Sequence, residues 1–338
     1  MKGVLLVNLG SPDSTKPSDV KKYLDEFLMD PRVIDVNWPL RAFIVKGIVL
    51  HTRPKKSAAA YQKIWWPEGS PLIVLSEKLQ NKVQQKTAVP VGLAMRYGSM
   101  SIQKGIQELA DKGVDDILVL PLYPQFAMAT TETITVLADQ IKQKHFPNIK
   151  LTHFPAFYND ENYIEVLTAS VKKQLANIDY EHLLFSYHGL PERHIRKQDT
   201  TKSHCKLDGS CCNTPSKAHK TCYRHQCLEV TKKVAEKLHL KEGTYSTSFQ
   251  SRLGMDQWLQ PYTDRTIERM GLNGTKKLAV VCPAFVSDCL ETLEEIAMEG
   301  KALFQEVGGE KFSTLSCLND DDNWASVVAN WINEWNKK

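Results

Sequence analysis

Short apolar runs alternate with longer amphipathic segments along the whole chain. Such alternation is typical of βαβ units, in which each strand of a parallel sheet is followed by a helix. We predict strands near residues 4–9, 90–95, 116–122, 149–154, 182–187, 244–249, 277–282 and 312–317. We predict helices near residues 17–29, 71–86, 101–112, 131–145, 160–177, 217–239, 287–306 and 322–336. The pattern therefore indicates an α/β protein.

The predicted strands fall into two sets of four, which suggests two similar halves. Residues 154–157, Phe-Pro-Ala-Phe, mark the expected break between them. The first strand runs into residues 8–12, Asn-Leu-Gly-Ser-Pro, which lack the G-x-G-x-x-G pattern of dinucleotide-binding enzymes. We therefore expect a doubly wound fold, whereas a nicotinamide or flavin enzyme is disfavoured.

Composition and charge narrow the class of protein. Of the 338 residues, 42% are hydrophobic and 24% are charged, which is the balance of a globular protein. We find neither a signal peptide nor an apolar stretch near the roughly 20 residues that span a bilayer, so we expect a cytoplasmic protein. The net charge of +4 arises in residues 193–227, where eight Lys and Arg meet two Asp. Because the basic character is local, it does not indicate nucleic-acid binding over the whole surface.

Two polar motifs follow apolar strands, about a hundred residues apart. The first is residues 185–191, Phe-Ser-Tyr-His-Gly-Leu-Pro, and the second is residues 282–295, which contain Glu291 and Glu295. The carboxyl ends of parallel strands form the ligand-binding edge of an α/β sheet. His188 and a carboxylate pair on one helix face could move protons or hold a divalent metal at this edge. The alternative is that His188 only makes hydrogen bonds with its neighbours and that Glu291 and Glu295 lie on a solvent-exposed helix face.

Residues 38–50 form a distinct apolar segment interrupted by Arg41 and Lys46, and a basic stretch follows them. The segment is too short to span a membrane. It could lie on a membrane surface or form an apolar lip over a pocket. An ordinary buried helix fits the pattern equally well.

Five of the eight cysteines, Cys205, Cys211, Cys212, Cys222 and Cys227, fall within 23 residues. In a cytosolic protein such clustering indicates metal ligands or redox groups rather than disulfides. The spacing matches neither the usual zinc ribbon nor the commonest ferredoxin pattern, so zinc and an iron–sulfur cluster both stay open. Adjacent Cys211 and Cys212 would have difficulty in binding one ion together. We therefore favour Cys205, Cys212, Cys222 and Cys227 as ligands, with Cys211 as the alternate.

Several short motifs together resemble the ferrochelatase family, whose members insert ferrous iron into a porphyrin at the end of haem synthesis. They are residues 8–12 (NLGSP), 68–71 (EGSP), 95–98 (MRYG), 120–125 (LPLYPQ), 186–191 (SYHGLP), 249–251 (FQS) with Trp258, and 287–293 (SDCLETL). They extend nearly from end to end of the chain, and the histidine and glutamate motifs are the most specific to the family.

The resemblance implies a chelatase-like α/β fold. Two Rossmann-like domains, each a four-stranded parallel sheet flanked by helices, would enclose a porphyrin cleft. Residues 1–155 and 307–338 would make the first domain, with the last helix returning to it. Residues 156–306 would make the second and carry His188, the cysteine segment and Glu291.

The resemblance also implies a lyase that inserts ferrous iron into protoporphyrin IX and releases two protons. His188 looks like the catalytic histidine and Glu291 like the glutamate that faces it, both in contact with the substrate iron, while Glu295 would continue an acidic path. Substrate binding is expected at Trp258, Tyr123, Arg96, Tyr97, Ser70, Pro191, Gln250 and Ser251. One departure concerns position 289, which is histidine in some members and Cys289 here.

Some bacterial members are thought to carry a [2Fe–2S] cluster, and residues 205–227 look like the segment that holds it. Family members vary in their association with membranes and in oligomeric state. We expect a monomer or homodimer, with contact through residues 38–50 at the inner membrane face.

Three alternatives stay open at this point. The chain could be a chelatase of similar fold that acts on cobalt or a corrinoid precursor, or a ferrochelatase whose substrate is coproporphyrin. It could also be a zinc-stabilised nucleic-acid-binding protein built on the basic cysteine segment. We do not expect nucleic-acid binding, because Tyr223 is essentially the only stacking aromatic among those lysines.

Overall fold

The computed structural model describes residues 1–252, 254 and 256–338, and the chain divides into two compact units. The first comprises Met1–Tyr123, Met128–Pro155 and Asn319–Lys338. The second comprises Pro124–Ala127 and Ala156–Leu318. The boundary at residue 155 lies where the sequence predicts it. Residues 307–318, expected in the first domain, belong instead to the second unit, because their strand pairs with the second sheet.

The sheet of the first unit contains four parallel strands, β1 (Lys2–Asn8), β2 (Val91–Met95), β3 (Asp116–Pro121) and β4 (Lys150–His153). Their order is β2-β1-β3-β4. Val4 on the central strand pairs with Val91 on one side and Leu118 on the other. β1, β2 and β3 are largely buried on both faces, which explains why they read as continuous apolar runs, whereas the edge strand β4 is partly exposed.

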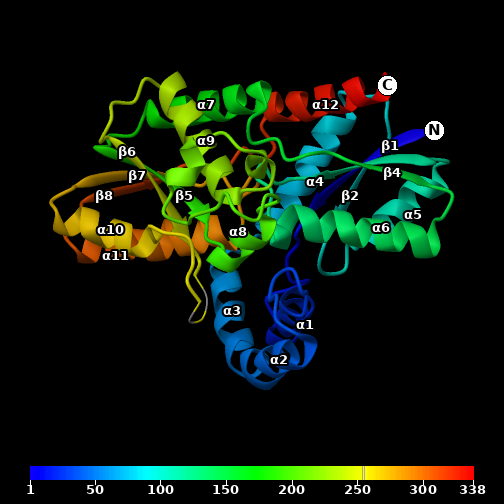
Figure 1. Ribbon diagram of the computed structural model, residues 1–338, viewed down its shortest axis with the longest axis horizontal. Helices are drawn as coiled ribbons and strands as arrows, with labels where there is room; N and C mark the ends of the chain where they lie inside the picture. Colours follow the sequence, from blue (N-terminus) through cyan, green and yellow to red (C-terminus); the bar gives the residue numbers. More distant parts are fainter. Residues whose placement is uncertain (253, 255) are drawn as a thin grey trace. The chain divides into compact units, whose positions relative to one another are not determined.

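Helices cover both faces of this sheet (Figure 1). They are α5 (Ile102–Asp111) with α6 (Thr133–His145), and α4 (Pro71–Gln84) with α12 (Asp322–Asn336). Leu5, Ile106 and Ile134 belong to the apolar cluster that joins the sheet to α5 and α6. A side-chain cap fixes the start of α12, where the Asp321 carboxylate accepts the backbone N–H groups of Asn323 and Trp324.

A separate group of helices precedes α4 in the first unit. It consists of α1 (Pro17–Leu28), α2 (Trp38–Ala42), the π-helical η1 (Phe43–Val49) and α3 (Leu50–Ile64). Val45 is buried, but Trp38 and Phe43 are 63% and 64% exposed. An ordinary buried helix therefore does not describe residues 38–50, since one side of the segment presents large apolar side chains to solvent.

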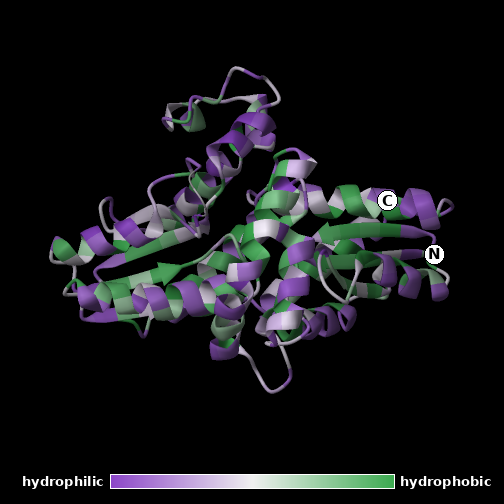
Figure 2. Cartoon of the chain, turned by 90° about the horizontal axis from the view of Figure 1, so that it is seen from below, coloured by the Kyte–Doolittle hydropathy of each residue, from purple (hydrophilic) through white to green (hydrophobic). Residues whose placement is uncertain are grey.

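The second unit repeats the plan with β5 (His182–His188), β6 (Tyr245–Gln250), β7 (Lys277–Val281) and β8 (Lys311–Thr314), in the order β6-β5-β7-β8. All four strands are parallel. The eight predicted strands and the α/β fold class are thus confirmed. In Figure 2 the hydrophobic colour runs along the strands, while the helices carry both colours, as expected of amphipathic helices packed on a buried sheet.

On one side of the second sheet lie α7 (Glu161–Leu175) and α9 (Tyr223–Lys237) (Figure 1). On the other lie α10 (Thr263–Leu272) and α11 (Lys301–Glu306), the latter continuing the π-helical η5 (Glu291–Gly300). The short helix α8 (Glu192–Gln198) follows β5 and leads into the cysteine segment with its two 3-10 turns, η3 (Ser210–Asn213) and η4 (Lys217–Lys220). Among the described residues, none of the helices has the length and apolar character needed to cross a bilayer.

Candidate active site

His188 is the last residue of β5, at the carboxyl edge of the second sheet. Its Nδ1 lies 2.6 Å from the carbonyl oxygen of Gly189. Because a carbonyl oxygen can only accept, Nδ1 carries the hydrogen and the lone pair of the neutral ring lies on Nε2. The ring centroid is 6.5 Å from that of Trp258 and 6.3 Å from that of Phe285. The imidazole therefore has two aromatic neighbours and is held in one tautomer by the Gly189 carbonyl.

The loop after His188 is pressed against the end of β6. The Gly189 N–H donates to the carbonyl oxygen of Gln250 at 2.7 Å, and a Cβ on Gly189 would lie 2.7 Å from that same oxygen and 3.3 Å from the Trp258 ring. Only glycine allows this close approach. Pro191 and Trp258 form an isolated antiparallel bridge that fixes both beside the histidine. The predicted substrate-binding residues Pro191 and Trp258 thus lie together next to His188.

Gln250 connects the histidine motif to the glutamate motif. Its side-chain oxygen accepts from the Ser186 hydroxyl at 2.7 Å, and its amide nitrogen donates to the backbone carbonyl of Glu291 at 3.2 Å. The side chain is almost fully buried. A buried amide that satisfies both of its ends in this way is fixed in orientation. The two strand-end motifs predicted from sequence are thus brought together through one residue of β6.

The glutamates lie on η5, whose π-helical turns follow an i→i+5 hydrogen-bond pattern. Burial raises the pKa of Glu295 to about 7, and the negative charges of Glu291 and Glu299 act in the same direction, while hydrogen bonds from Ser251 oppose the rise. Glu295 therefore exchanges a proton near neutral pH, as a proton carrier must.

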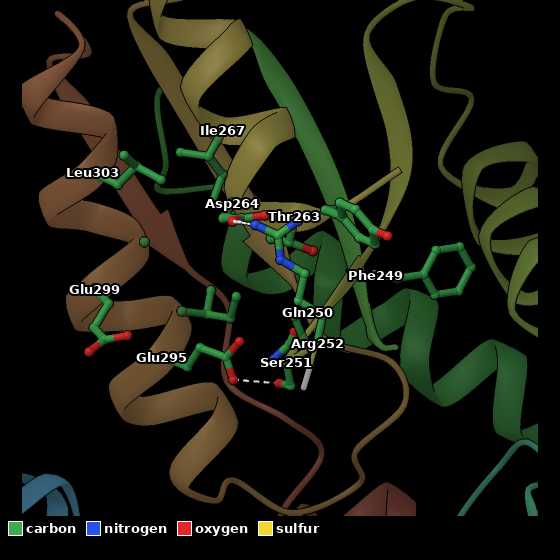
Figure 3. A pocket seen from close by; sticks show the side chains of 13 residues that line it. Phe249, Gln250, Ser251, Arg252, Thr263, Asp264, Ile267, Glu295, Glu299 and Leu303 are labelled. Carbon is green, nitrogen blue, oxygen red and sulfur yellow. Dashed lines mark hydrogen bonds and ion pairs between the residues drawn. The ribbon is translucent and has the colours of Figure 1, made fainter. Parts of the chain in front are cut away.

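Ser251 Oγ donates to the Glu295 carboxylate at 2.5 Å and does so from a left-handed backbone conformation, with φ of +65°. Figure 3 shows this contact at the wall of a cavity of about 370 Å³, which is also lined by Glu299. Arg252 and Asp264 form an ion pair of 2.9 Å on another part of the wall. The cavity opens beside Glu295 and Glu299 of η5, and His188 does not line it.

Arg96 and Tyr97 belong to a buried polar network of the first unit, at the end of β2. Arg96 Nη2 contacts the Asp30 carboxylate at 2.5 Å, and the Tyr97 hydroxyl donates to the same group at 3.0 Å. Burial would raise the pKa of Asp30, but hydrogen bonds from Thr133 and the Arg32 N–H, with the charge of Arg96, lower it overall. Tyr97 has no exposed surface. The network gives both residues a structural role in this unit, and their contact with substrate stays a prediction.

Tyr123 and Ser70 are also in the first unit, and both are buried. The Tyr123 hydroxyl donates to the Asn8 side-chain oxygen at 2.5 Å and accepts from the Leu9 N–H at 3.1 Å. Ser70 precedes α4, and its carbonyl oxygen accepts the Val74 N–H. These contacts fix the loops after β1 and before α4, and a substrate contact of either residue stays a prediction.

In the cysteine segment each of the five thiols lies close enough to at least one other to affect its pKa or to be affected by it. Burial raises the pKa of Cys205 to about 11, and nearby Cys211 and Cys222 add to the rise. A hydrogen bond from the Cys212 thiol lowers the pKa of Cys222, helped by the backbone N–H groups of His225 and Arg224 at the start of α9. Cys227 is fully buried on α9 and is influenced by Cys222 and Tyr223. Cys222 is the thiol common to these interactions, since it influences or is influenced by Cys205, Cys212 and Cys227.

Among the described residues, no group of three or more His, Cys, Asp or Glu side chains is arranged to hold a metal ion.

Two residues of the site were not predicted from the sequence. Phe285 lies in the glutamate motif and packs against His188, and Glu299 extends the acidic row by a further four residues. The i, i+4, i+8 spacing of Glu291, Glu295 and Glu299 was the available signal for the latter.

The family model and the curated relatives agree on one family. A family model described as Ferrochelatase matches residues 1–335. A ferrochelatase of Pseudomonas fluorescens SBW25 is 47% identical over 327 residues, 96% of this chain and 95% of that protein. The protein of the same name from strain Pf0-1 is 48% identical over 328 residues, 96% of each chain. The solved structure of SirB from Bacillus subtilis with Fe³⁺ has a TM-score of 0.54 at 12% identity, covering 98% of this chain and 94% of that one, and so supports the fold.

Proposed function

The chain belongs to the ferrochelatase family and is a lyase that inserts ferrous iron into protoporphyrin, and we propose that His188 and Glu291 contact the metal from opposite faces of the ring. The single observation that supports this arrangement most strongly is the bridge through Gln250, which contacts the His188 loop through its backbone and Glu291 through its side chain.

Insertion makes three chemical demands. Two pyrrole N–H protons must leave, the ferrous ion must lose water, and the flat ring must bend so that its nitrogen lone pairs become available. His188 presents the lone pair of Nε2, since Nδ1 donates to Gly189, and this lone pair can accept a pyrrole proton or bind iron. Trp258 and Phe285 hold the ring of His188 and so limit the geometries it can adopt.

Glu291, Glu295 and Glu299 form the acidic side of the mechanism. Carboxylate oxygens are hard donors that suit a partly hydrated ferrous ion. Glu295, with a pKa of about 7, can take up a proton at neutral pH and release it again toward the cavity that it lines with Glu299. The row therefore offers a route for protons between Glu291 and solvent.

The test separates binding from insertion. His188→Ala and Glu291→Ala proteins are mixed anaerobically with protoporphyrin, and binding is followed by porphyrin fluorescence before ferrous iron is added. We expect near-normal porphyrin binding and loss of haem formation in both variants, because each removes a group at the reacting centre. Retained turnover in both would refute the assignment.

Residues 38–50 are proposed to contact a membrane surface. Trp38, Leu40, Phe43 and Ile48 are large apolar side chains with about half or more of their surface exposed. Lys46 lies among them, and the exposed Arg53, Lys55 and Lys56 follow on α3. Apolar groups interleaved with cations are typical of segments that lie in the interface of an anionic membrane.

The cysteine segment is proposed to hold a [2Fe–2S] cluster through Cys205, Cys212, Cys222 and Cys227, with Cys211 as the alternate. The donor type fits, because soft thiolates suit iron–sulfur clusters, and the hydrogen bond from Cys212, with backbone N–H groups and the charge of Arg224, lowers the pKa of the Cys222 thiol. The cluster would supply a redox centre and a crosslink of the segment. The Lys206 N–H lies 3.4 Å from Cys211 Sγ, which supports Cys211 as the alternate ligand.

A further inference from the structure

Three histidines that the ferrochelatase mechanism does not use lie together in the second unit, His204 directly before the cysteine segment and His219 and His225 within it. The rings of His219 and His225 are stacked at 3.6 Å with only 11° between their planes, and His204 meets His219 edge-on at 5.2 Å. None of these rings contacts the residues assigned to iron insertion in any described contact.

Two of these rings aim the same nitrogen at one point. His204 Nε2 lies 2.9 Å and His219 Nε2 3.2 Å from the carbonyl oxygen of Cys211, and the two Nε2 atoms are 3.3 Å apart. A neutral imidazole has at each nitrogen either a hydrogen or a lone pair. The nitrogen–nitrogen contact and both contacts with the carbonyl oxygen therefore cannot all be made at full strength by two neutral rings.

A cation just above the centre of this triangle can accept a lone pair from each of the three atoms. Nitrogen ligands at about 2.0–2.1 Å from a tetrahedral ion are about 3.3 Å apart, which is the separation of the two Nε2 atoms. We propose that His204, His219 and the Cys211 carbonyl bind a borderline divalent cation such as Co²⁺, Zn²⁺ or Fe²⁺, with water completing its shell. Imidazole nitrogen selects these ions over Mg²⁺ and Ca²⁺.

The surroundings hold both ligands in place. His225 is fixed by the contact of its Nδ1 with the Cys212 carbonyl at 2.8 Å, and its ring supports that of His219 by stacking. The His204 backbone N–H donates to Asp199 at 2.8 Å, which anchors the other ligand. Such outer contacts orient metal-binding imidazoles in protein sites. The site uses none of the residues assigned to iron insertion, and it takes the backbone carbonyl of Cys211 rather than a thiol as its ligand.

The test uses Co²⁺ as the probe, because thiolate ligands give it an intense near-ultraviolet charge-transfer absorption that imidazole and carbonyl ligands do not. Reduced protein is dialysed anaerobically against Co²⁺, and bound metal is counted. We expect wild-type protein to bind one more equivalent than His204→Gln with His219→Gln, and the difference spectrum to show visible bands without thiolate charge transfer. His51→Gln, an exposed histidine of α3, is the control and should bind as the wild type does.

A single His219→Gln substitution should weaken this equivalent by at least about tenfold. In wild-type protein alone, Zn²⁺ should displace the Co²⁺ whereas excess Mg²⁺ should not, so the proposal stays testable even where a variant folds poorly. Equal stoichiometry in wild type and the double variant would overturn it. So would a lost equivalent that carries thiolate charge transfer, since the histidines would then only support the cysteines. Neither result bears on haem formation.

Discussion

Replacing Glu295 with glutamine should stabilise the protein, and the gain should depend on pH. Burial, with the charges of Glu291 and Glu299, raises the pKa of this carboxyl from 4.5 to about 7. A shift of that size corresponds to about 3 kcal/mol at pH values above both pKa values. This energy is an upper bound, because the Glu295 side chain keeps some exposed surface and its surroundings can relax.

The sign follows from proton binding. Below the unfolded pKa, both states hold the proton and the group has no effect on stability. As the pH rises through that value the unfolded chain releases its proton, while the folded protein retains it until about pH 7, so the stability of the wild type falls over this window. Glutamine cannot ionise, and its amide oxygen still accepts from the Ser251 hydroxyl. The gain should therefore grow from less than about 1 kcal/mol near pH 5 to a larger value, at most about 3 kcal/mol, near pH 8.

The assay is urea unfolding of metal-free and porphyrin-free protein at several pH values, followed by circular dichroism. The two units could unfold in separate transitions, so the comparison uses the transition that changes with the substitution. Glu299→Gln, an exposed carboxylate on the same helix, is the matched control and should give a small gain with little pH dependence. A gain for Glu295→Gln that is the same at pH 5 and pH 8, or a loss at pH 8, would refute the reasoning.

Three further predictions concern other parts of the protein. Gln250→Leu removes the amide contacts with Ser186 and Glu291 and should lower turnover at least about tenfold with near-normal porphyrin binding. The control Ser248→Ala removes a buried contact with Thr263 and should cost about 1 kcal/mol of stability while turnover stays intact. Equal losses of turnover in the two variants would contradict this prediction. Cys222→Ser should lose cluster absorption and unfold at a lower temperature, while the initial rate of haem formation per folded molecule changes little. Unchanged absorption would exclude Cys222 as a ligand. Trp38→Ser with Phe43→Ser should weaken co-sedimentation with anionic vesicles about tenfold or more, and Leu272→Ser, an exposed apolar change elsewhere, should not.

The strands and most helices could be predicted because their signals are local. Central parallel strands are buried on both faces and appear as short continuous apolar runs, and the structure confirms all eight. The helices that were not predicted include the 15-residue α3, which has Pro54 inside it, as well as short or irregular ones. α8 has seven residues and α10 has ten, and the first turns of residues 38–64 combine α and π geometry, for which the sequence pattern gives no distinct period.

The candidate site likewise contains features that could be predicted from the sequence and features that could not. His188, Glu291 and Glu295 were identifiable because specific residue types follow recognisable strands. The role of Gln250 was not, since a side chain that joins two strand ends is defined by partners 64 and 41 residues away in sequence. The elevated pKa of Glu295 depends on burial, and the convergence of His204 and His219 depends on the path of the loop between them.

The sequence by itself determined the α/β class, the two sets of four strands and the residues able to carry proton and metal chemistry, because hydrophobic periodicity and residue type act over a few neighbouring positions. Only the tertiary structure decided which of those groups meet, which are buried and which side of residues 38–50 faces solvent. Contacts, desolvation and exposure arise from segments distant in sequence, so no local pattern encodes them.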